Sequence, residues 1–588
     1  MPLNQDPTQL MKVALGEAEA DLAIVNGTVL NVYTGELLKG DNVIIQGDRV
    51  AYVGKNTGQA IGSQTKVIDA TGKFLIPGFI DGHTHIINGI YSMSELVRYA
   101  MKGGTTTIIT EAGELGFPLG YRGVMEAVRE VRHQPMKIFV VVPPMVTVSP
   151  SAHDHVLTAG EIRKLMRQKE IVGLGESFWG PVVEGDPAFL NQITEVRRAG
   201  KKVDGHTAGA RDNKLQAYAA AGATSCHEPT TAEEVVERLR AGLYVLLREG
   251  ETRRELESII PKIKDAAIDF RRLILTTDGI GSWQLTADGY LEFIVQKAIN
   301  LGLDPVRAIQ MASLNVAQRF SLDDSIGGIA PGKYADILVI PDLTTIKPEY
   351  VISNGKVAVR NGEVLVPPKK NNYPGWMRHS VHLDRTFTAD DFAVRVNSDR
   401  PQVKVRVIEQ VAFLVTREVV MELPISNGQV QKDVNHDIIK VAAIERVYQP
   451  GQTFTGFIRG FGLKRGAMAS STAWDTTDMI VVGADEADMA LAVNRIRELN
   501  GGILVCAGGK VLAELPLPIA GMVSELPMAT IADKLHQIQR AAVDLGFTSP
   551  DIRQTMCVLT TGGIPFIRIS EQGLVDVRQN RLVGLIVE

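Results

Sequence analysis

The chain has 588 residues, more than one ordinary hydrophobic core can hold, so two or three domains are expected. Its composition, with 45% hydrophobic and 22% charged residues, is that of an ordinary globular protein. A formal net charge of -5 without a lysine- or arginine-rich stripe argues against a nucleic-acid partner.

The cysteines and the N-terminal residues bear on the compartment. Cys226, Cys506 and Cys557 lie far apart and form no CxxC pair, so a disulfide framework is not expected and a reducing compartment fits. Residues 1–21 lack the apolar segment of a signal peptide. No apolar run is long enough to cross a membrane. We therefore expect a cytoplasmic protein with no membrane partner.

The first part of the chain consists of short apolar runs separated by turn residues. Residues 22–27 are typical of a strand that runs into a turn, and residues 41–54 of a β-hairpin. Similar short strands return late in the chain, for example at residues 351–357. We expect the two flanks, residues 1–73 and 326–366, to form one composite β-sandwich module.

Between these flanks, residues 74–325 alternate apolar runs with amphipathic helical stretches, a pattern typical of parallel β/α units. Eight candidate strands can be counted: 79–83, 106–110, 137–142, 171–176, 202–206, 224–227, 243–247 and 273–278. Eight such units in about 250 residues predict a (β/α)8 TIM-like barrel.

The last third of the chain follows a Pro- and Asn-rich stretch, residues 367–375, which is typical of a linker. Residues 376–588 then predict a separate C-terminal α/β domain. Within it, residues 478–482 and 503–506 are typical of strands, and residues 486–499 of a helix. The overall fold class is therefore α/β.

One motif stands out at the start of the predicted barrel, where an apolar run leads into His83 and His85. In extended backbone, residues two apart project from the same face, and two neighbouring imidazoles suit a metal ion. The carboxyl ends of barrel strands meet at one mouth, where active sites are built. The metal-competent residues at those predicted strand ends are His83, His85, Glu176, His206, His227 and Asp278.

Four imidazoles and two carboxylates without a thiolate suit divalent ions such as Mn²⁺, Fe²⁺ or Zn²⁺. Six ligands are more than one catalytic ion with an open position needs, so we predict two ions, with Glu176 bridging them. The ions would lower the pKa of a shared water and create hydroxide at neutral pH. Asp278 would accept its proton and pass it to the leaving group, so Asp278 and Glu176 are the predicted catalytic residues.

Other polar and aromatic residues near the strand ends are candidates for substrate contact. Glu111 and Glu114, after the second strand, are candidates to bind a ring N–H or to shuttle protons. Phe178 and Trp179 follow Glu176, and Trp283 follows the eighth strand. These aromatic rings would either stack on a planar heterocycle or pack against the barrel rim, and both interpretations stay open.

The order His-x-His, Glu, His, His and Asp along the barrel resembles the amidohydrolase superfamily, and within it the chain is similar to the adenine deaminase family. The similar stretches fall in both the barrel and the C-terminal domain: 77–85, 173–176, 204–206, 213–228, 230–250, 308–315, 329–336, 460–463 and 515–521. The resemblance implies hydrolytic deamination of adenine, or a related 6-aminopurine, to hypoxanthine and ammonia, with Mn²⁺ or Fe²⁺ favoured. We further expect a small heterocyclic substrate and a homodimer or higher homo-oligomer.

Around the predicted mouth the chain departs from the pattern of that family. Family members usually have Ile-Glu-Ser-Ser at residues 86–89 and Asp-Pro-His-Glu at residues 111–114; this chain has Ile-Ile-Asn-Gly and Glu-Ala-Gly-Glu. Residues 277–280 and 473–477 also differ. These departures favour, as an alternative, an enamidase-like hydrolase of cyclic amides or lactams. A non-catalytic binding protein is a third hypothesis, against which the intact ligand set argues.

Overall fold

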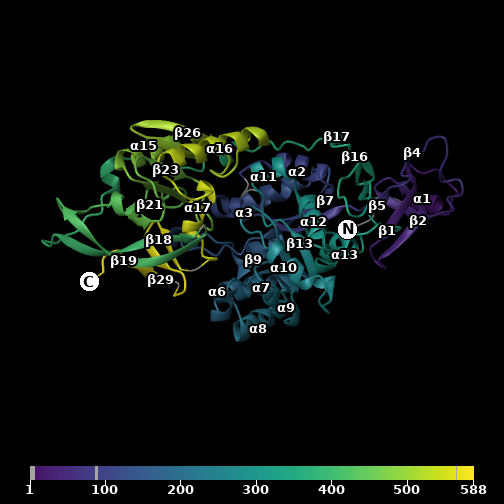
Figure 1. Cartoon of the computed structure of the whole chain (residues 1–588), viewed down its shortest axis with the longest axis horizontal. Helices are drawn as coiled ribbons and strands as arrows, with labels where there is room; N and C mark the ends of the chain where they lie inside the picture. Colours follow the sequence, from purple (N-terminus) through teal and green to yellow (C-terminus); the bar gives the residue numbers. More distant parts are fainter. Residues whose placement is uncertain (1–6, 87–89, 413, 565, 580, 588) are drawn as a thin grey trace.

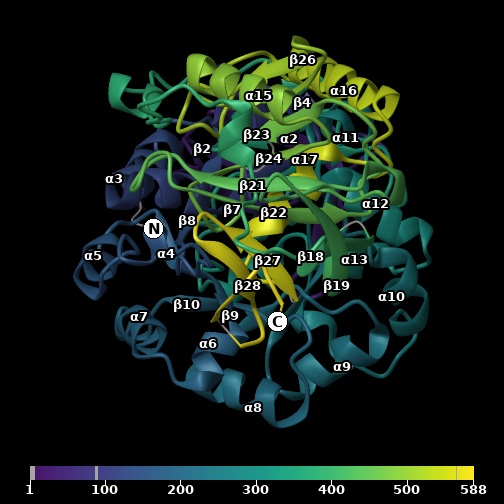
Figure 2. The same cartoon turned by 90° about the vertical axis from the view of Figure 1, so that its left-hand side faces the viewer.

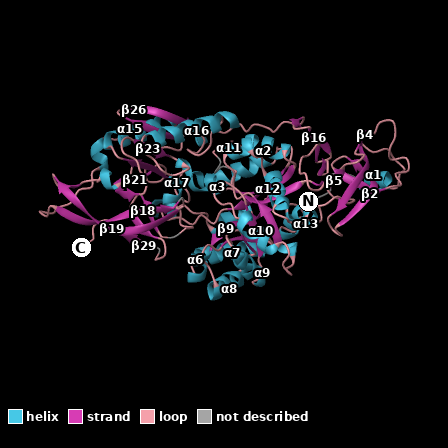
Figure 3. Ribbon diagram, viewed as in Figure 1, coloured by secondary structure: helices cyan, strands magenta, loops and turns pink. Residues whose placement is uncertain are grey.

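The computed structural model describes residues 7–86, 90–412, 414–564, 566–579 and 581–587. The molecule is elongated, with a β-rich part at one end, a barrel in the middle and a second β-rich part at the other end (Figure 1). Figure 3 shows that helices dominate the middle and strands dominate the two ends. Residues 87–89, part of the altered stretch after the histidine pair, lie outside the described residues.

Strands from both flanks of the barrel join in one sheet of the order β17-β16-β15-β14-β5-β1-β2-β3, with β4 paired to β1. Its strands are β1 (Leu22–Asn31), β2 (Glu36–Gln46), β3 (Arg49–Gly54), β4 (Lys66–Asp69), β5 (Phe74–Pro77), β14 (Ile337–Ile340), β15 (Tyr350–Ser353), β16 (Lys356–Arg360) and β17 (Glu363–Val364). The short helix α1 (Pro7–Ala14) precedes them.

The two flanks meet where β14 pairs antiparallel with β5, with Leu338 opposite Ile76. Side chains from both flanks, among them Ile24, Val43 and Ile352, then pack into one buried cluster that forms the core of this composite module. Because β5 belongs to this sheet, the sheet extends to Pro77, past the boundary predicted at residue 73. The domain boundaries themselves stay a prediction.

The barrel contains all eight predicted strands, each within a few residues of the predicted range: β6 (Phe79–Thr84), β7 (Thr105–Glu111), β8 (Lys137–Val142), β9 (Ile171–Phe178), β10 (Lys202–His206), β11 (Ser225–Cys226), β12 (Tyr244–Arg248) and β13 (Leu273–Thr276). They form two parallel arcs, β10-β9-β8-β7-β6 and β11-β12-β13. Backbone hydrogen bonds close the arcs into one barrel: Thr224 N donates to Val203 O (2.9 Å), and Asp278 N donates to His83 O (3.2 Å). The predicted (β/α)8 fold class is confirmed.

Helices surround these strands: α2 (Met93–Lys102), α3 (Gly113–Val131), α4 (Pro150–His153), α5 (Ala159–Leu165), α6 (Trp179–Glu184), α7 (Pro187–Arg198), α8 (Asp212–Ala221), α9 (Ala232–Arg240), α10 (Leu256–Ile263), α11 (Ser282–Ala287), α12 (Leu291–Asn300), α13 (Pro305–Met311) and α14 (Leu314–Arg319). In α12, Leu291, Ile294 and Val295 recur at helical spacing and are buried against the barrel. The long α3 is kinked at Gly120, whose left-handed φ of 59° only glycine adopts readily.

The C-terminal part is built on a nine-stranded sheet of the order β20-β19-β18-β22-β21-β24-β23-β25-β26 and a smaller sheet, β27-β28-β29. Its elements are β18 (Gln402–Ala412), β19 (Val415–Ser426), β20 (Gln429–Val430), β21 (Ile439–Glu445), β22 (Thr453–Arg459), β23 (Ala467–Ser470), β24 (Asp478–Gly483), α15 (Glu486–Leu499), β25 (Gly502–Ala507), β26 (Lys510–Pro516), α16 (Met528–Asp544), α17 (Ile552–Cys557), β27 (Ile567–Ser570), β28 (Gly573–Asp576) and β29 (Arg581–Val583). The predicted strand–helix–strand segment corresponds to β24, α15 and β25.

The C-terminal sheet lies across one end of the barrel, as the end-on view shows (Figure 2). Hydrogen bonds tie the two parts together: Met528 N donates to Glu95 Oε2 (2.9 Å), and Tyr448 Oη donates to Phe117 O (2.6 Å). The contact with Phe117 identifies the covered end. Phe117 lies in α3, which begins just after the carboxyl end of β7, so the C-terminal sheet covers the end to which the carboxyl ends of the barrel strands point. Among the described residues, no helix is long and apolar enough to cross a membrane.

A buried ion pair joins the other end of the barrel to the composite module. Lys137 Nζ, at the start of β8, lies 2.6 Å from Asp336 Oδ2, and the two side chains are 8% and 7% exposed. Asp336 also accepts a hydrogen bond from Asn354 N at 3.0 Å. The ion pair therefore joins a barrel strand to residues beside β14 and β15.

We expect Lys137→Met to destabilise the protein by about 3–5 kcal/mol, because it leaves the Asp336 carboxylate buried without its cation. The matched control is Arg378→Met, which breaks an ion pair with Glu525 whose side chains are 36% and 40% exposed. That change should cost at most about 1 kcal/mol. Urea unfolding followed by tryptophan fluorescence measures both, and equal losses in the two variants would contradict the expectation.

Candidate active site

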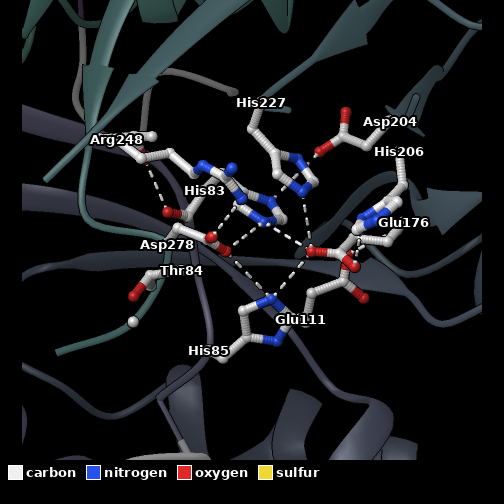
Figure 4. A network of polar contacts seen from close by, with 12 residues as sticks. His83, Thr84, His85, Glu111, Glu176, Asp204, His206, His227, Arg248 and Asp278 are labelled. Atoms are coloured by element: carbon white, nitrogen blue, oxygen red, sulfur yellow. Dashed lines mark hydrogen bonds and ion pairs between the residues drawn. The ribbon is translucent and has the colours of Figure 1, made fainter. Parts of the chain in front are cut away.

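Four ionisable side chains converge where β6, β9 and β13 end (Figure 4). The Nε2 atoms of His83 and His85 each lie 3.1 Å from Glu176 Oε1. Asp278 Oδ1 lies 3.2 Å from His83 Nε2 and 3.6 Å from His85 Nε2. One oxygen of Glu176 and one oxygen of Asp278 therefore face the histidine pair.

The remaining two histidines complete the cluster from the neighbouring strands. His227, which follows β11, places Nε2 3.2 Å from Glu176 Oε1. His206, the last residue of β10, places Nδ1 3.3 Å from Glu176 Oε2. Glu176 thus offers one oxygen to three imidazoles and its other oxygen to the fourth, and Figure 4 shows it between them. All six residues predicted as metal ligands come together.

The donor set fits a divalent metal. Neither ring nitrogen of the buried His206 makes a hydrogen bond of proper geometry, although Nδ1 is close to Glu176. Buried nitrogens without a partner are costly, and a cation would satisfy them. Ligand atoms of His83, Glu176, His227 and Asp278 lie within 4.8 Å of one another, as do those of His206, His227 and Glu228. This cluster of imidazoles and carboxylates suggests that the protein uses divalent metal.

The electrostatics of the cluster also favour a cation. Burial raises the pKa of Glu176, but the charge of His227 and hydrogen bonds from the histidines outweigh it, so the pKa lies well below its usual range. Burial also raises the pKa of Asp278, but the hydrogen bond to His83 and the charge of Arg248 outweigh it. The pKa of Asp278 therefore lies below its usual value. Both carboxylates are therefore anionic at neutral pH.

Two charged residues beside the cluster were not predicted from the sequence. Arg248, the last residue of β12, places Nη1 2.5 Å from Glu228 Oε1 and 3.0 Å from Asp278 Oδ2. Glu228 Oε1 in turn lies 3.2 Å from His227 Nε2. Arg248 therefore holds the outer oxygen of Asp278 and leaves the inner one facing the histidines. Their position in the sequence could have revealed them, because Arg248 and Glu228 each directly follow a predicted strand.

A pocket opens beside the cluster, and three of the predicted substrate-contact residues line it. Glu114 Oε1 lies 3.0 Å from His85 Nδ1, and Glu111 Oε1 accepts a hydrogen bond from Glu176 N at 2.7 Å. The Phe178 ring packs edge-on against the His206 ring, with 4.8 Å between centroids. These two glutamates and one phenylalanine are therefore placed next to the cluster.

The other two predicted contact residues, Trp179 and Trp283, do not line this pocket. The indole N–H of Trp179 donates to Ala208 O at 2.8 Å, and Lys214 Nζ lies 5.0 Å from its ring, so Trp179 packs on the barrel rim. Trp283 lies on α11 and is 63% exposed. Helix α11 turns its tryptophan towards solvent and buries Gln284 and Leu285 instead.

The C-terminal part of the chain supplies a large share of the pocket wall, of which the sequence singled out only residues 473–477, through their departure from the family pattern. Its contributing residues include Trp474, Asp475, Met522, Gln554, Thr561 and Gly563. Gly563 lies against Phe178, because a β-carbon at that position would stand 2.8 Å from the phenyl ring. The pocket is therefore shared between the barrel and the C-terminal sheet that covers it.

Comparison with known families agrees with this architecture. A model described as "Amidohydrolase family" matches residues 74–361, which contain the barrel and all six clustered residues. A model described as "Adenine deaminase C-terminal domain" matches residues 413–581. The barrel and its cluster define a hydrolytic enzyme of the amidohydrolase class.

Full-length relatives narrow the assignment. The chain is 38% identical to "Adenine deaminase" of Moorella thermoacetica over 590 residues, covering 100% of this chain and 99% of that protein. It is 37% identical to "Adenine deaminase" of Paracoccus denitrificans over 592 residues, covering 100% and 98%. It is 36% identical to "Adenine deaminase 3" of Rhizobium meliloti over 592 residues, covering 100% and 99%. The chain belongs to the adenine deaminase family.

We expect His83→Ala and His206→Ala each to lower the divalent metal content per chain, because each change removes an imidazole from the cluster. The matched control is His436→Ala, whose side chain is 76% exposed and bonded only to Asp433. Elemental analysis by mass spectrometry after purification without chelator measures the metal. Thermal unfolding checks that the variants are folded. Unchanged metal content in both cluster variants would contradict the ligand assignment.

Proposed function

We propose that this enzyme hydrolyses adenine, or a related 6-aminopurine, to hypoxanthine and ammonia. The observation that carries the proposal is the convergence of four imidazoles and two carboxylates on Glu176 beside a pocket, in a chain whose full-length relatives bear the name adenine deaminase. The reaction breaks the exocyclic C–N bond: the water oxygen stays on the ring carbon, and the amino group leaves as ammonia.

The residues that hold metal in this proposal follow from the geometry of the cluster. His83, His85 and Asp278 would hold one ion, and His206 and His227 a second. Glu176, whose Oε1 faces His83, His85 and His227 and whose Oε2 faces His206, would bridge the ions. Mn²⁺ and Fe²⁺ are favoured by resemblance to the family, and Zn²⁺ suits the same donors. Ions bound there would lower the pKa of a water molecule enough to supply hydroxide at neutral pH.

Asp278 is the residue proposed to move the proton. Its Oδ1 faces the histidines while Arg248 holds Oδ2 at 3.0 Å, and its backbone N–H donates to His83 O. Its φ of 53° is left-handed, a conformation that aspartate tolerates better than most residues. The fixed, ionised carboxylate can accept a proton from the attacking water and deliver it to the departing amino group.

Phe178 and Glu114 are proposed to contact the substrate ring. Phe178 is fixed between His206 and Gly563, and its ring is placed to stack on a planar heterocycle. The Glu114 side chain is 7% exposed and its Oε1 contacts His85, while its buried Oε2 has no hydrogen-bond partner among the residues that the structure describes. That oxygen is available to accept a hydrogen bond from an amino group or ring N–H.

A second candidate is the hydrolysis of a cyclic amide or lactam by the same cluster. The observation that favours it is that Glu111, Gly113, Gly279 and Ile280, which depart from the family pattern, line the pocket. The altered residues 87–89 lie outside the described residues. The homodimer or higher homo-oligomer also stays a prediction.

Ammonia release across a panel of purines, pterins and cyclic amides, with Mn²⁺ supplied, distinguishes these functions. We expect adenine or another 6-aminopurine to give the highest kcat/KM, and treatment with a chelator to abolish the activity. Ring opening of a cyclic amide, with no ammonia released from any 6-aminopurine, would replace the first proposal with the second.

We expect Asp278→Asn to fold, to keep at least one metal ion and to lose turnover by several orders of magnitude. The loss should exceed the ~10²–10⁴ typical of removing a general base, because metal placement suffers as well. The matched control is Asp288→Asn, an exposed aspartate at the end of α11, which should keep wild-type turnover. Near-normal activity of Asp278→Asn would transfer the proton role to another residue, Glu111 first.

A further inference from the structure

The pocket wall contributed by the C-terminal part centres on the segment between β23 and β24. Trp474 and Asp475 lie in this segment, and both line the pocket that contains the metal-competent cluster. Asp475 has a left-handed φ of 63°. Such a conformation in a non-glycine residue is held by its surroundings and recurs at binding sites. The segment is therefore placed to meet whatever occupies the pocket.

Hydrogen bonds from the region after α17 fix this segment. Trp474 N donates to Cys557 O at 3.3 Å, and Thr560 Oγ1 donates to Trp474 O at 2.7 Å. The Thr561 hydroxyl donates to Asp475 Oδ2. A carboxylate has about four acceptor sites, so Asp475, which lines the pocket, keeps acceptor capacity beyond the Thr561 hydroxyl and the Gly562 N–H. Asp475 is thus a rigidly held acceptor in the wall.

Trp474 adds a donor to the same wall. Its indole Nε1 is buried and has no hydrogen-bond partner among the described residues. An indole N–H can only donate, and leaving it buried and unpaired is unfavourable. A ligand that places an acceptor nitrogen in the pocket would recover this cost. The wall therefore offers one acceptor and one donor.

The charge state of Asp475 agrees with a role as acceptor. Burial and the nearby negative charge of Glu176 raise the pKa of Asp475 to about 6, against the lowering effect of the hydrogen bond from Thr561. The carboxyl is therefore mostly ionised at pH 7.5. Behind it, the buried Arg568 donates through Nε to Thr561 O at 3.1 Å and supplies a nearby positive charge.

We propose that Asp475 and Trp474 recognise the ring of a free purine base, an inference that rests on the proposed function. The carboxylate of Asp475 accepts the N–H of the five-membered ring, and the indole of Trp474 donates to a ring nitrogen. A base that carries a substituent at N9 lacks that N–H and leaves the remaining acceptor capacity of the carboxylate unused, with the bulk of the substituent directed at it. Sites built around such a hydrogen bond discriminate strongly against ligands that lack it.

The test compares adenine with 9-methyladenine in the metal-loaded wild type and in Asp475→Asn. In the variant, the single amide oxygen is engaged by Thr561 and the amide NH₂ opposes the ring N–H. We expect kcat/KM for adenine to fall about 10- to 100-fold, the range for a hydrogen bond to a charged group, with the value for 9-methyladenine nearly unchanged. The preference for the free base would therefore shrink by the same factor.

Two further variants keep the test specific. Trp474→Phe keeps the ring and removes the donor, and should lower kcat/KM for both bases to a similar extent. Asp544→Asn, an exposed aspartate at the end of α16, is the matched control and should change neither value. Metal content and melting temperature should match the wild type in all three variants, which separates recognition from a structural effect.

Calorimetric binding of the two bases tests the inference independently of turnover. A wild type that binds adenine more tightly than 9-methyladenine, with the difference lost in Asp475→Asn, supports it even if no ammonia is released. Such binding without ammonia release would contradict the proposed reaction but not the recognition role. Unchanged preference in Asp475→Asn, or no binding of either base to the wild type, would overturn the recognition role.

Discussion

The structure depends on one electrostatic constraint, the burial of six ionisable side chains, five of them arranged around Glu176. Isolated charges in such a place would cost several kcal/mol each, so they persist only as a mutually compensating set. Each member comes from the end of a different element or from the histidine pair at the end of β6, so the set exists only when the barrel is closed. The hydrogen bond from Asp278 N to His83 O shows this directly, because it joins the last barrel strand to the first across the site.

A second layer of contacts holds these side chains in place. Arg248 orients Asp278, and Glu111 accepts the backbone N–H of Glu176. Deeper in the barrel, the buried Asp81 accepts hydrogen bonds from the hydroxyls of Thr277 and Tyr290, each at 2.7 Å. Such outer contacts fix the orientation of reactive groups before substrate arrives, which removes reorganisation from the chemical step.

The sequence predicted those features that local patterns encode. Eight apolar runs and the histidines at their ends followed from strand periodicity and from the geometry of a parallel barrel. Glu228 and Arg248 could have been included, because both follow predicted strands. Whether Trp283 faces the pocket or the solvent could not be predicted, because it depends on the rotation of α11 about its axis. The resemblance pointed to residues 473–477 at the mouth, but the contacts that hold Trp474 and Asp475 there were out of reach, because they join residues far apart in the chain.

The pocket combines two parts with different physical requirements. The cluster is fixed by the backbone of the barrel strands, so its residues cannot move without disturbing the barrel itself. The opposite wall is held by the C-terminal segment through Cys557, Thr560 and Thr561, with no direct bond between Trp474 or Asp475 and the six clustered residues among the described contacts. Under the proposed recognition role, changes in this wall would alter which ring is bound while the hydrolytic groups stay in register. The same separation would let a chain keep its ligand set and still depart from its family at residues 473–477.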